Sequence, residues 1–207
     1  EKDDKYLNKF KTMVMWAVAN QAEDGSWITF DYVYPDHPYS AMAQGEGASL
    51  LLRAYALTNN EIYLDSARKA LDFMITPLNE GGTAFIEGDS IYLKEYTGLP
   101  TVLNGWSFAL FGLIDYIIIS NSKKIKNIIN KTITTLETNL EKFDNGFWSM
   151  YDIKEKIASP FYHNLHIAQL KVLYDLTGIE KFKSFYEKWD QYRKKRKNKR
   201  KAFWLKA

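Results

Sequence analysis

The sequence predicts an all-α protein, an α/α toroid formed as an incomplete barrel of antiparallel helical hairpins, with short β-hairpins at one rim. Three observations lead to this prediction: helix-like segments recur at a fixed offset, short polar turns separate them from further helical stretches, and Gly-Trp turns open strand-like excursions. The chain has 207 residues, of which 46% are hydrophobic, so it can bury the core of a single domain.

The recurring segments begin at Ala41, Thr101 and Phe161, and each has apolar or small residues at helical spacing. When the three segments are aligned, one polar residue and one leucine recur in each. The offset between successive segments is 60 residues in both cases. The aligned residues are Gln44, Asn104 and Asn164, then Leu50, Leu110 and Leu170. A helix pair that recurs at such a period indicates stacked helical hairpins, with the three segments as the inner layer.

Seven main helices follow from this pattern. Three begin near Ser40, Thr101 and Pro160, and the others cover about 5–21, 61–75, 123–142 and 179–198. Asn and Ser at 58–60 and 120–122 suit short turns with helix caps. The segments 24–35, 81–100 and 145–153 read as short strands and turns.

Charge divides the chain into a domain at 1–192 and a basic tail at 193–207. The tail holds nine Lys or Arg and no acid, which leaves the domain 19 basic and 25 acidic residues, a net charge of −6. A basic tail is suited to a polyanionic glycan, an anionic membrane or nucleic acid, or is a solvated helix end.

Other composition signals narrow the class of protein. There is no cysteine, which excludes disulfides and thiolate chemistry. No apolar run approaches the roughly 20 residues of a membrane-spanning helix, and the sequence as given has no signal peptide. We expect a soluble protein, and the compartment and oligomeric state stay open.

The stretch "QAEDGSW" at 21–27 has the spacing of the repeated motif in triterpene cyclases. A cyclase also needs an Asp-rich protonating motif and a longer apolar cavity, and neither is present. The motif is therefore interpreted as a turn at Asp24-Gly25 followed by Trp27, which fills the space between neighbouring hairpins.

Candidate chemistry gathers where the inner helices begin. In "FYHNLHIAQL", His163 and His166 lie one helical turn apart beside Tyr162. No third ligand at a compatible spacing accompanies the two histidines, so no metal site is predicted. Glu95 precedes the second inner helix, where a carboxylate serves as acid, base or helix cap.

The other rim candidates are polar or aromatic residues at equivalent positions of the repeats. They are Tyr39, Gln44 and Glu46 at the first repeat, Asn104 at the second, and Tyr151, Asp152 and Lys154 after the second Gly-Trp turn. In a toroid these ends converge on one mouth, so the sequence predicts a single groove there.

Four segments together resemble the C-terminal domain of the D-glucuronyl C5-epimerases, which convert glucuronate to iduronate within heparan-type polymers. They are "YSAMAQGEGASLLLRAYALT", "EYTGLPTVLNGWSFALFGLIDY", "GFWSMYDI" and "YHNLHIAQLKVLYDLTG". The order and spacing are similar from about residue 10 to residue 190.

This resemblance implies roles for individual residues. Glu95 falls on the family's catalytic glutamate, and Tyr151 and Tyr162 fall on two essential tyrosines. Lys154 stands where the family has a substrate-binding arginine, and His163 and His166 match its histidine pair. Lysine keeps the charge of arginine but lacks its planar, bidentate fork. The N-terminal β-rich regions of the animal enzymes, which contribute a further tyrosine, have no counterpart in this chain.

The implied reaction removes the C5 proton of a uronate and returns one to the opposite face. It needs two opposed acid/base groups and cationic neutralisation of the carboxylate, but no cofactor. A tyrosine in either role is expected to need nearby cations that lower its pKa. The expected partner is an anionic uronate-containing glycan, and no nucleic acid is expected. The alternatives are a polysaccharide lyase or hydrolase on the same scaffold, or a non-catalytic glycan-binding domain.

Overall fold

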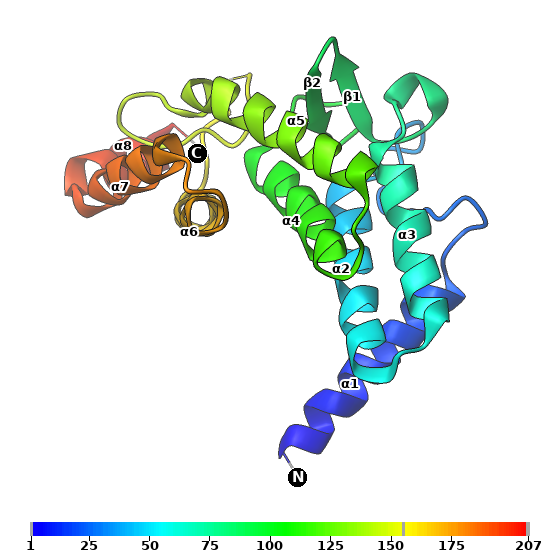
Figure 1. Ribbon diagram of the computed structural model, residues 1–207. Helices are drawn as coiled ribbons and strands as arrows, with labels where there is room; N and C mark the ends of the chain where they lie inside the picture. The colour runs from blue at the N-terminus through cyan, green and yellow to red at the C-terminus, as the bar shows by residue number, and fades with distance from the viewer. Residues whose placement is uncertain (1, 155, 206–207) are drawn as a thin grey trace.

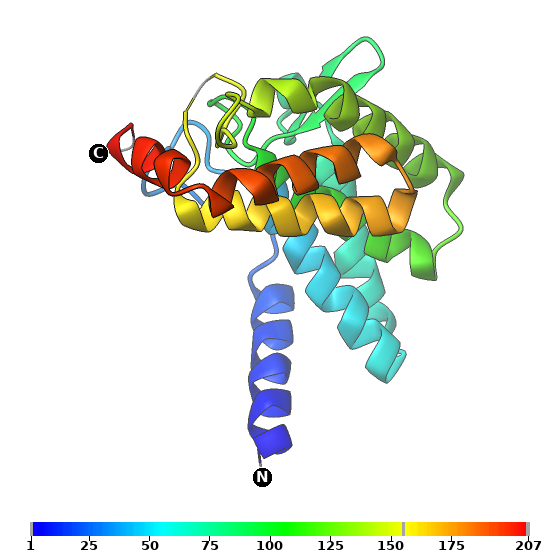
Figure 2. The ribbon, with the colours of Figure 1, turned by 90° about the vertical axis from the view of Figure 1, so that its left-hand side faces the viewer.

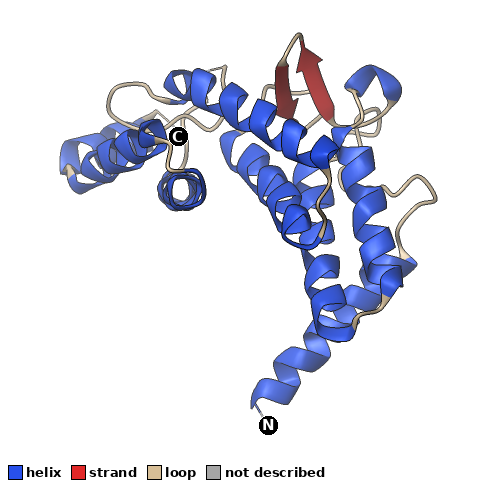
Figure 3. Ribbon diagram, in the orientation of Figure 1, coloured by secondary structure: helices blue, strands red, loops and turns tan. Residues whose placement is uncertain are grey.

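The computed structural model describes residues 2–154 and 156–205 and contains eight α-helices joined by turns, loops and one short hairpin (Figures 1 and 3). The helices are α1 (Lys2–Ala19), α2 (Ala41–Thr58), α3 (Glu61–Ile75), α4 (Leu103–Ile119), α5 (Lys123–Asn139), α6 (Pro160–Thr177), α7 (Glu180–Lys194) and α8 (Arg196–Trp204). The strands are β1 (Ala84–Glu87) and β2 (Ser90–Leu93), and short 3-10 helices occupy Leu78–Glu80 and Leu140–Phe143. The predicted all-α class with a short β-hairpin is confirmed.

The three repeated segments form α2, α4 and α6. α4 lies between the other two, while α3 packs on α2, α5 on α4 and α7 on α6. Leu110 and Leu170 are fully buried, and Leu50 is half-buried against the same core, as the repeat predicts. The array is open in the described part of the chain (Figure 1).

Glycine allows α2 and α4 to approach closely. A Cβ at Gly45 would lie 2.7 Å from the Ala109 Cα, and a Cβ at Gly112 would lie 2.6 Å from the Gly45 Cα. These are main-chain neighbours, so they cannot move aside as a side chain would. The small residues of the repeated segment therefore determine how tightly the inner helices pack.

Of the three strand-like segments, 81–100 contains the antiparallel pair β1 and β2. Residues 145–153 make only isolated bridges, one from Asp152 to Val102 and another from Met150 to Ile157. The prediction of strands at 24–35 is wrong, because that segment is a series of turns. The ring of Trp27 is nevertheless buried, and its Nε1 donates to the Ala17 carbonyl at 2.9 Å. Trp27 thus packs between α1 and Gly47 of α2.

The ends of the chain differ in their contacts. α1 projects away from the body in both views (Figures 1 and 2). The basic run expected as a tail begins in the last turn of α7 and continues as α8, which contacts α6 and α7. This extra helix raises the count of main helices from the predicted seven to eight in the described residues. None of the helices described is both long and apolar enough to span a membrane.

Candidate active site

Main-chain hydrogen bonds bring the beginnings of α2 and α4 together with two loops. The Ala41 amide donates to the Lys94 carbonyl at 2.8 Å, and the Leu103 amide donates to the Tyr151 carbonyl at 3.1 Å. Tyr162 in the first turn of α6 contacts the Tyr151 ring, with 4.8 Å between ring centroids. Helix N-termini favour anions, so this end of the molecule is suited to an acidic ligand.

Glu95 lies next to the beginning of α4 in this region. Its side chain is buried against α4, where Gly105 leaves space: a Cβ there would lie 2.5 Å from the Glu95 Cβ and closer still to Oε2. Asn104 Nδ2 donates to Glu95 Oε2 at 3.2 Å. Burial raises the pKa of Glu95 above its ordinary value, and the nearby charge of Glu46 raises it further, while hydrogen bonds from Tyr96 and Asn104 oppose the shift.

Three tyrosines extend from Glu95. The Tyr96 hydroxyl is hydrogen-bonded to the Glu95 carboxylate and to the Tyr151 hydroxyl, and Tyr162 lies close enough to influence both tyrosines. Burial, followed by the Glu95 charge, raises the pKa of Tyr151. Tyr151 therefore does not have the lowered pKa that we expect of a tyrosine acting as acid or base beside cations.

An aromatic wall continues from Tyr96. Its ring stacks on Phe30, with 4.7 Å between centroids, and meets Tyr34 edge-on at 5.9 Å. Both partners come from the loop between α1 and α2, and the same loop exposes Tyr32 almost completely. Aromatic faces next to a polar cluster are suited to holding the apolar face of a sugar ring.

Lysines lie next to the cluster. Lys94 is buried, and its ammonium donates to the Leu99 carbonyl and to Thr101 Oγ1. Burial, followed by the charge of Lys154, lowers the pKa of Lys94 to about 8, and the Asp152 carboxylate opposes that shift. The Lys156 ammonium lies 5.3 Å from the centre of the Tyr151 ring.

The two predicted histidines lie in the interior. His163 Nδ1 accepts a hydrogen bond from the Ser149 amide at 3.1 Å, so its proton is on Nε2, which donates to the Trp189 carbonyl at 3.1 Å. Ser149 Oγ lies between His163 Nδ1 and His166 Nδ1, at 2.8 and 3.0 Å. Burial lowers the pKa of His163 to about 4 and that of His166 to about 3, so both rings are neutral.

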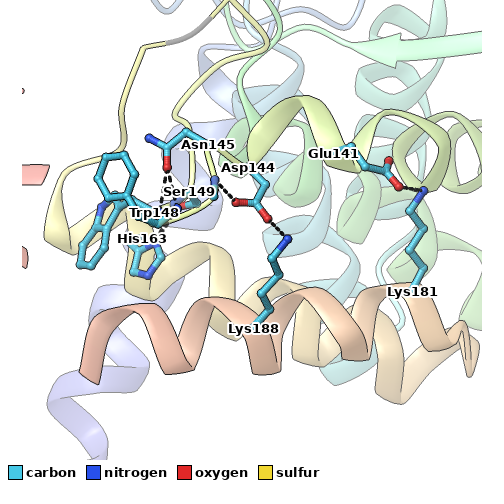
Figure 4. A network of polar contacts seen from close by, with 10 residues as sticks. Glu141, Asp144, Asn145, Trp148, Ser149, His163, Lys181 and Lys188 are labelled. Carbon is cyan, nitrogen blue, oxygen red and sulfur yellow. Dashed lines mark hydrogen bonds and ion pairs between the residues drawn. The ribbon is translucent and has the colours of Figure 1, made fainter. Parts of the chain in front are cut away.

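These contacts anchor the loop that carries Tyr151 (Figure 4). The Trp148 ring stacks on His163, with 3.7 Å between centroids. Asp144 Oδ1 accepts from the Gly146 amide, and Asp144 Oδ2 pairs with Lys188 of α7 at 2.5 Å. The histidines therefore position the loop that carries Tyr151 through Ser149, two residues before that tyrosine.

Two other predicted residues lie outside the cluster. Gln44 is fully buried and exchanges two hydrogen bonds with the main chain of Trp27, at 3.3 and 3.0 Å. Tyr39 is half-buried and packs edge-on against Phe73 of α3, with 4.9 Å between centroids. Both side chains make contacts that shape the fold around the site.

The structure thus brings together Glu95, Asn104, Tyr151 and Tyr162 and places Lys154 close to Lys94. Selection from the sequence missed Tyr96 and Lys94, and their position beside Glu95 in "KEYTGLP" is the signal that could have identified them. Among the described residues, no three His, Cys, Asp or Glu side chains gather as metal ligands would.

A family model described as "D-glucuronyl C5-epimerase C-terminus" matches residues 30–191 of this chain. The chain belongs to the D-glucuronyl C5-epimerase family. It is 30% identical over 210 residues to the D-glucuronyl C5-epimerase of Caenorhabditis elegans, a match that covers 87% of this chain and 34% of that protein. It is also 30% identical over 155 residues to an uncharacterized protein of Methanocaldococcus jannaschii, covering 72% of this chain and 50% of the relative.

This member of the C5-epimerase family therefore spans about a third of one curated relative and half of the other. The match includes the loop with Glu95 and Tyr96, the loop with Tyr151, and the start of α6. It ends before α8, which begins at Arg196.

Proposed function

We propose that this protein epimerises a uronic acid residue at C5, of the glucuronate-to-iduronate type, within an anionic glycan. The observation that carries the proposal is the continuous hydrogen-bonded group of Glu95, Tyr96 and Tyr151, with Tyr162 against it. A carboxylate can accept a proton, and neutral hydroxyls beside it can donate one, so the group can both remove and return a proton. Membership of the C5-epimerase family supports the same reaction class.

Glu95 is the proposed base. Its raised pKa brings the carboxylate closer to neutral pH, where a general base works best, and Asn104 with Tyr96 holds it in place. In the forward step the C5–H bond breaks, its proton moves to Glu95, and the electron pair delocalises into the uronate carboxyl group as an enediolate.

A tyrosine on the opposite face is the proposed acid. In this proposal Tyr162, which is half-buried and contacts Tyr151, delivers a proton to C5 from the other side. The step leaves Glu95 protonated and the tyrosine as a phenolate, and proton exchange with solvent restores both. Tyr151, kept protonated by burial and by the Glu95 charge, donates a hydrogen bond to the developing negative charge.

Cations neutralise the uronate carboxylate in this proposal. Lys154 supplies the exposed charge, and Lys94 beneath it is held by Leu99 and Thr101. Removal of the C5 proton adds a second negative charge to the uronate. The lysines lower the energy of that charge and so favour the removal. Gln44, Tyr39 and the two histidines act on substrate only by positioning these groups.

The test is incubation of the protein with a polymer of alternating glucuronate and N-acetylglucosamine in heavy water, followed by NMR for deuterium at C5. Glu95→Gln should lower incorporation by roughly 10²-fold or more while the protein stays folded, and Tyr151→Phe and Tyr162→Phe should also lower it. If the wild-type protein binds the polymer but incorporates no deuterium, the epimerase proposal is wrong. An unsaturated uronate absorbing in the near ultraviolet would indicate a lyase instead, because the same intermediate then expels the C4 substituent.

A further inference from the structure

The basic run beyond the family match forms a cationic helix. Lys195 and α8 together carry six cations and no acid. They are Lys195, Arg196, Lys197, Lys199, Arg200 and Lys201. Across the described residues these six enter no ion pair, whereas Arg193 and Lys194 of α7 both pair with Asp190. The Lys201 ammonium lies over the Phe147 ring, and the charge of the other five is directed to solvent or to a ligand.

α8 is attached to the loop that carries Tyr151. Ala202 is buried, and Asn198 Nδ2 donates to the Tyr192 carbonyl at 3.3 Å. The Lys201 ammonium lies 3.9 Å from the centre of the Phe147 ring. Phe147 is four residues before Tyr151, so the helix is positioned against the proposed catalytic loop.

A cavity of about 630 Å³ lies between the end of α8 and that loop, lined in part by Lys142, Lys156 and Leu205. Lys156 also stands over the Tyr151 ring. The cavity therefore lies between the C-terminal end of α8 and Lys156, the lysine that borders the proposed active site.

Two acidic residues also line this cavity, but lysines of α7 neutralise them. Glu141 pairs with Lys181 at 2.7 Å, and Asp144 pairs with Lys188 at 2.5 Å (Figure 4). The potential along the cavity is therefore dominated by the remaining lysines.

The outward face of α8 combines cations with an aromatic ring. At about 3.6 residues per turn, Arg196, Arg200 and Trp204 follow one another in a row opposite the inward-facing Asn198 and Ala202. Trp204 is 72% exposed. A helix that lies on a membrane separates its basic face from its aromatic face, whereas here they coincide. Carboxylates that alternate with apolar sugar faces match such a surface.

We propose that α8 and the adjoining cavity bind the uronate chain beyond the residue that is epimerised. This inference rests on the proposed C5 epimerisation. In this inference the cationic helix increases the affinity for long substrates, and the Glu95 cluster carries out the proton transfer.

The test compares a variant carrying Arg196→Gln, Lys197→Gln and Arg200→Gln with a matched control. Glutamine is a good helix former, so α8 is retained. The control carries Lys5→Gln, Lys9→Gln and Lys11→Gln, which remove the same charge from exposed positions on α1, far from α8 (Figures 1 and 2). Circular dichroism and urea unfolding check that both variants fold.

Two assays are used: C5 deuterium incorporation on a tetrasaccharide and on a long polymer of alternating glucuronate and N-acetylglucosamine, and direct binding of the same polymer. The α8 variant should raise the KM for the polymer by about tenfold, from three lost surface ion pairs. Its kcat and its turnover of the tetrasaccharide should match wild type, as should all constants of the control. Polymer binding by wild type should weaken with salt, and less so in the variant.

Unchanged binding and KM for the polymer in the α8 variant would overturn the inference. So would a selective loss of binding to phosphatidylserine vesicles or to a DNA duplex with polymer binding intact, which would assign α8 to that partner instead. If wild type incorporates no deuterium into either substrate but the α8 variant still loses polymer binding, the epimerase proposal fails and the polymer site stands.

Discussion

Gly105 provides the sharpest test of how Glu95 is held. A Cβ at this position would lie 2.5 Å from the Glu95 Cβ and 2.8 Å from its Cδ. Carbon atoms in contact prefer about 3.5–4.0 Å. In Gly105→Ala, the Glu95 side chain must therefore move by about 1 Å, which also strains its hydrogen bond from Asn104.

We expect Gly105→Ala to lower the activity much more than the stability. Overpacking costs about 1–3 kcal/mol, and replacing a glycine inside a helix returns roughly 1 kcal/mol, so the free energy of unfolding should fall by about 0–2 kcal/mol. A misplacement of about 1 Å in a catalytic group can lower the rate by about 10²-fold. Gly105→Ala should thus give a folded protein with little C5 exchange.

Gly112→Ala is the matched control on the same helix. Its Cβ would meet the main chain of Gly45 at 2.5 and 2.6 Å, which is equally close but two turns away from Glu95. We expect it to lose more stability and less activity. Urea unfolding and deuterium incorporation at C5, corrected for the folded fraction, measure both effects. If Gly105→Ala kept most of the wild-type exchange, the close packing of Glu95 against α4 would have no influence on the reaction.

Three further predictions concern neighbouring groups. Glu46→Gln should move the acidic limb of the pH–rate profile to lower pH, because the Glu46 charge raises the pKa of Glu95; an unmoved limb would refute the coupling. Stability should fall as pH decreases from 6.5, because the unfolded chain binds protons at that pH while the pKa values of His163 and His166 are lowered to about 4 and about 3. Urea unfolding at pH 6.5 and pH 5.5 should show a loss of up to about 1.4 kcal/mol per histidine, and His166→Gln should reduce it. Gln44→Met should lower the free energy of unfolding by roughly 2–4 kcal/mol, since two buried main-chain groups lose their partners; a loss below about 1 kcal/mol would mean that water replaces the amide.

The sequence identified the helices well because their signals are local. Apolar spacing and capping residues predicted 61–75, and α3 covers Glu61–Ile75. The 60-residue offset predicted the inner helices α2, α4 and α6, which begin within a few residues of their expected positions. The segment 24–35 misled the prediction, because alternating apolar residues next to a Gly-Trp turn look like a strand, yet within residues 2–154 and 156–205 no strand pairs with it.

For the candidate site, the sequence by itself determined which residues with acid, base or cationic chemistry occur near the starts of the inner helices, and the family they resemble. Only the tertiary structure decided which of them meet. Tyr96 lies next to Glu95 in the chain, but its place between Glu95 and Tyr151 depends on the pairing of two distant loops. His163 and His166 begin the same kind of repeat as Asn104, yet Ser149 and the neighbouring tryptophans enclose them. Side-chain direction and burial arise from contacts between segments far apart in the sequence, and a local pattern carries no information about those contacts.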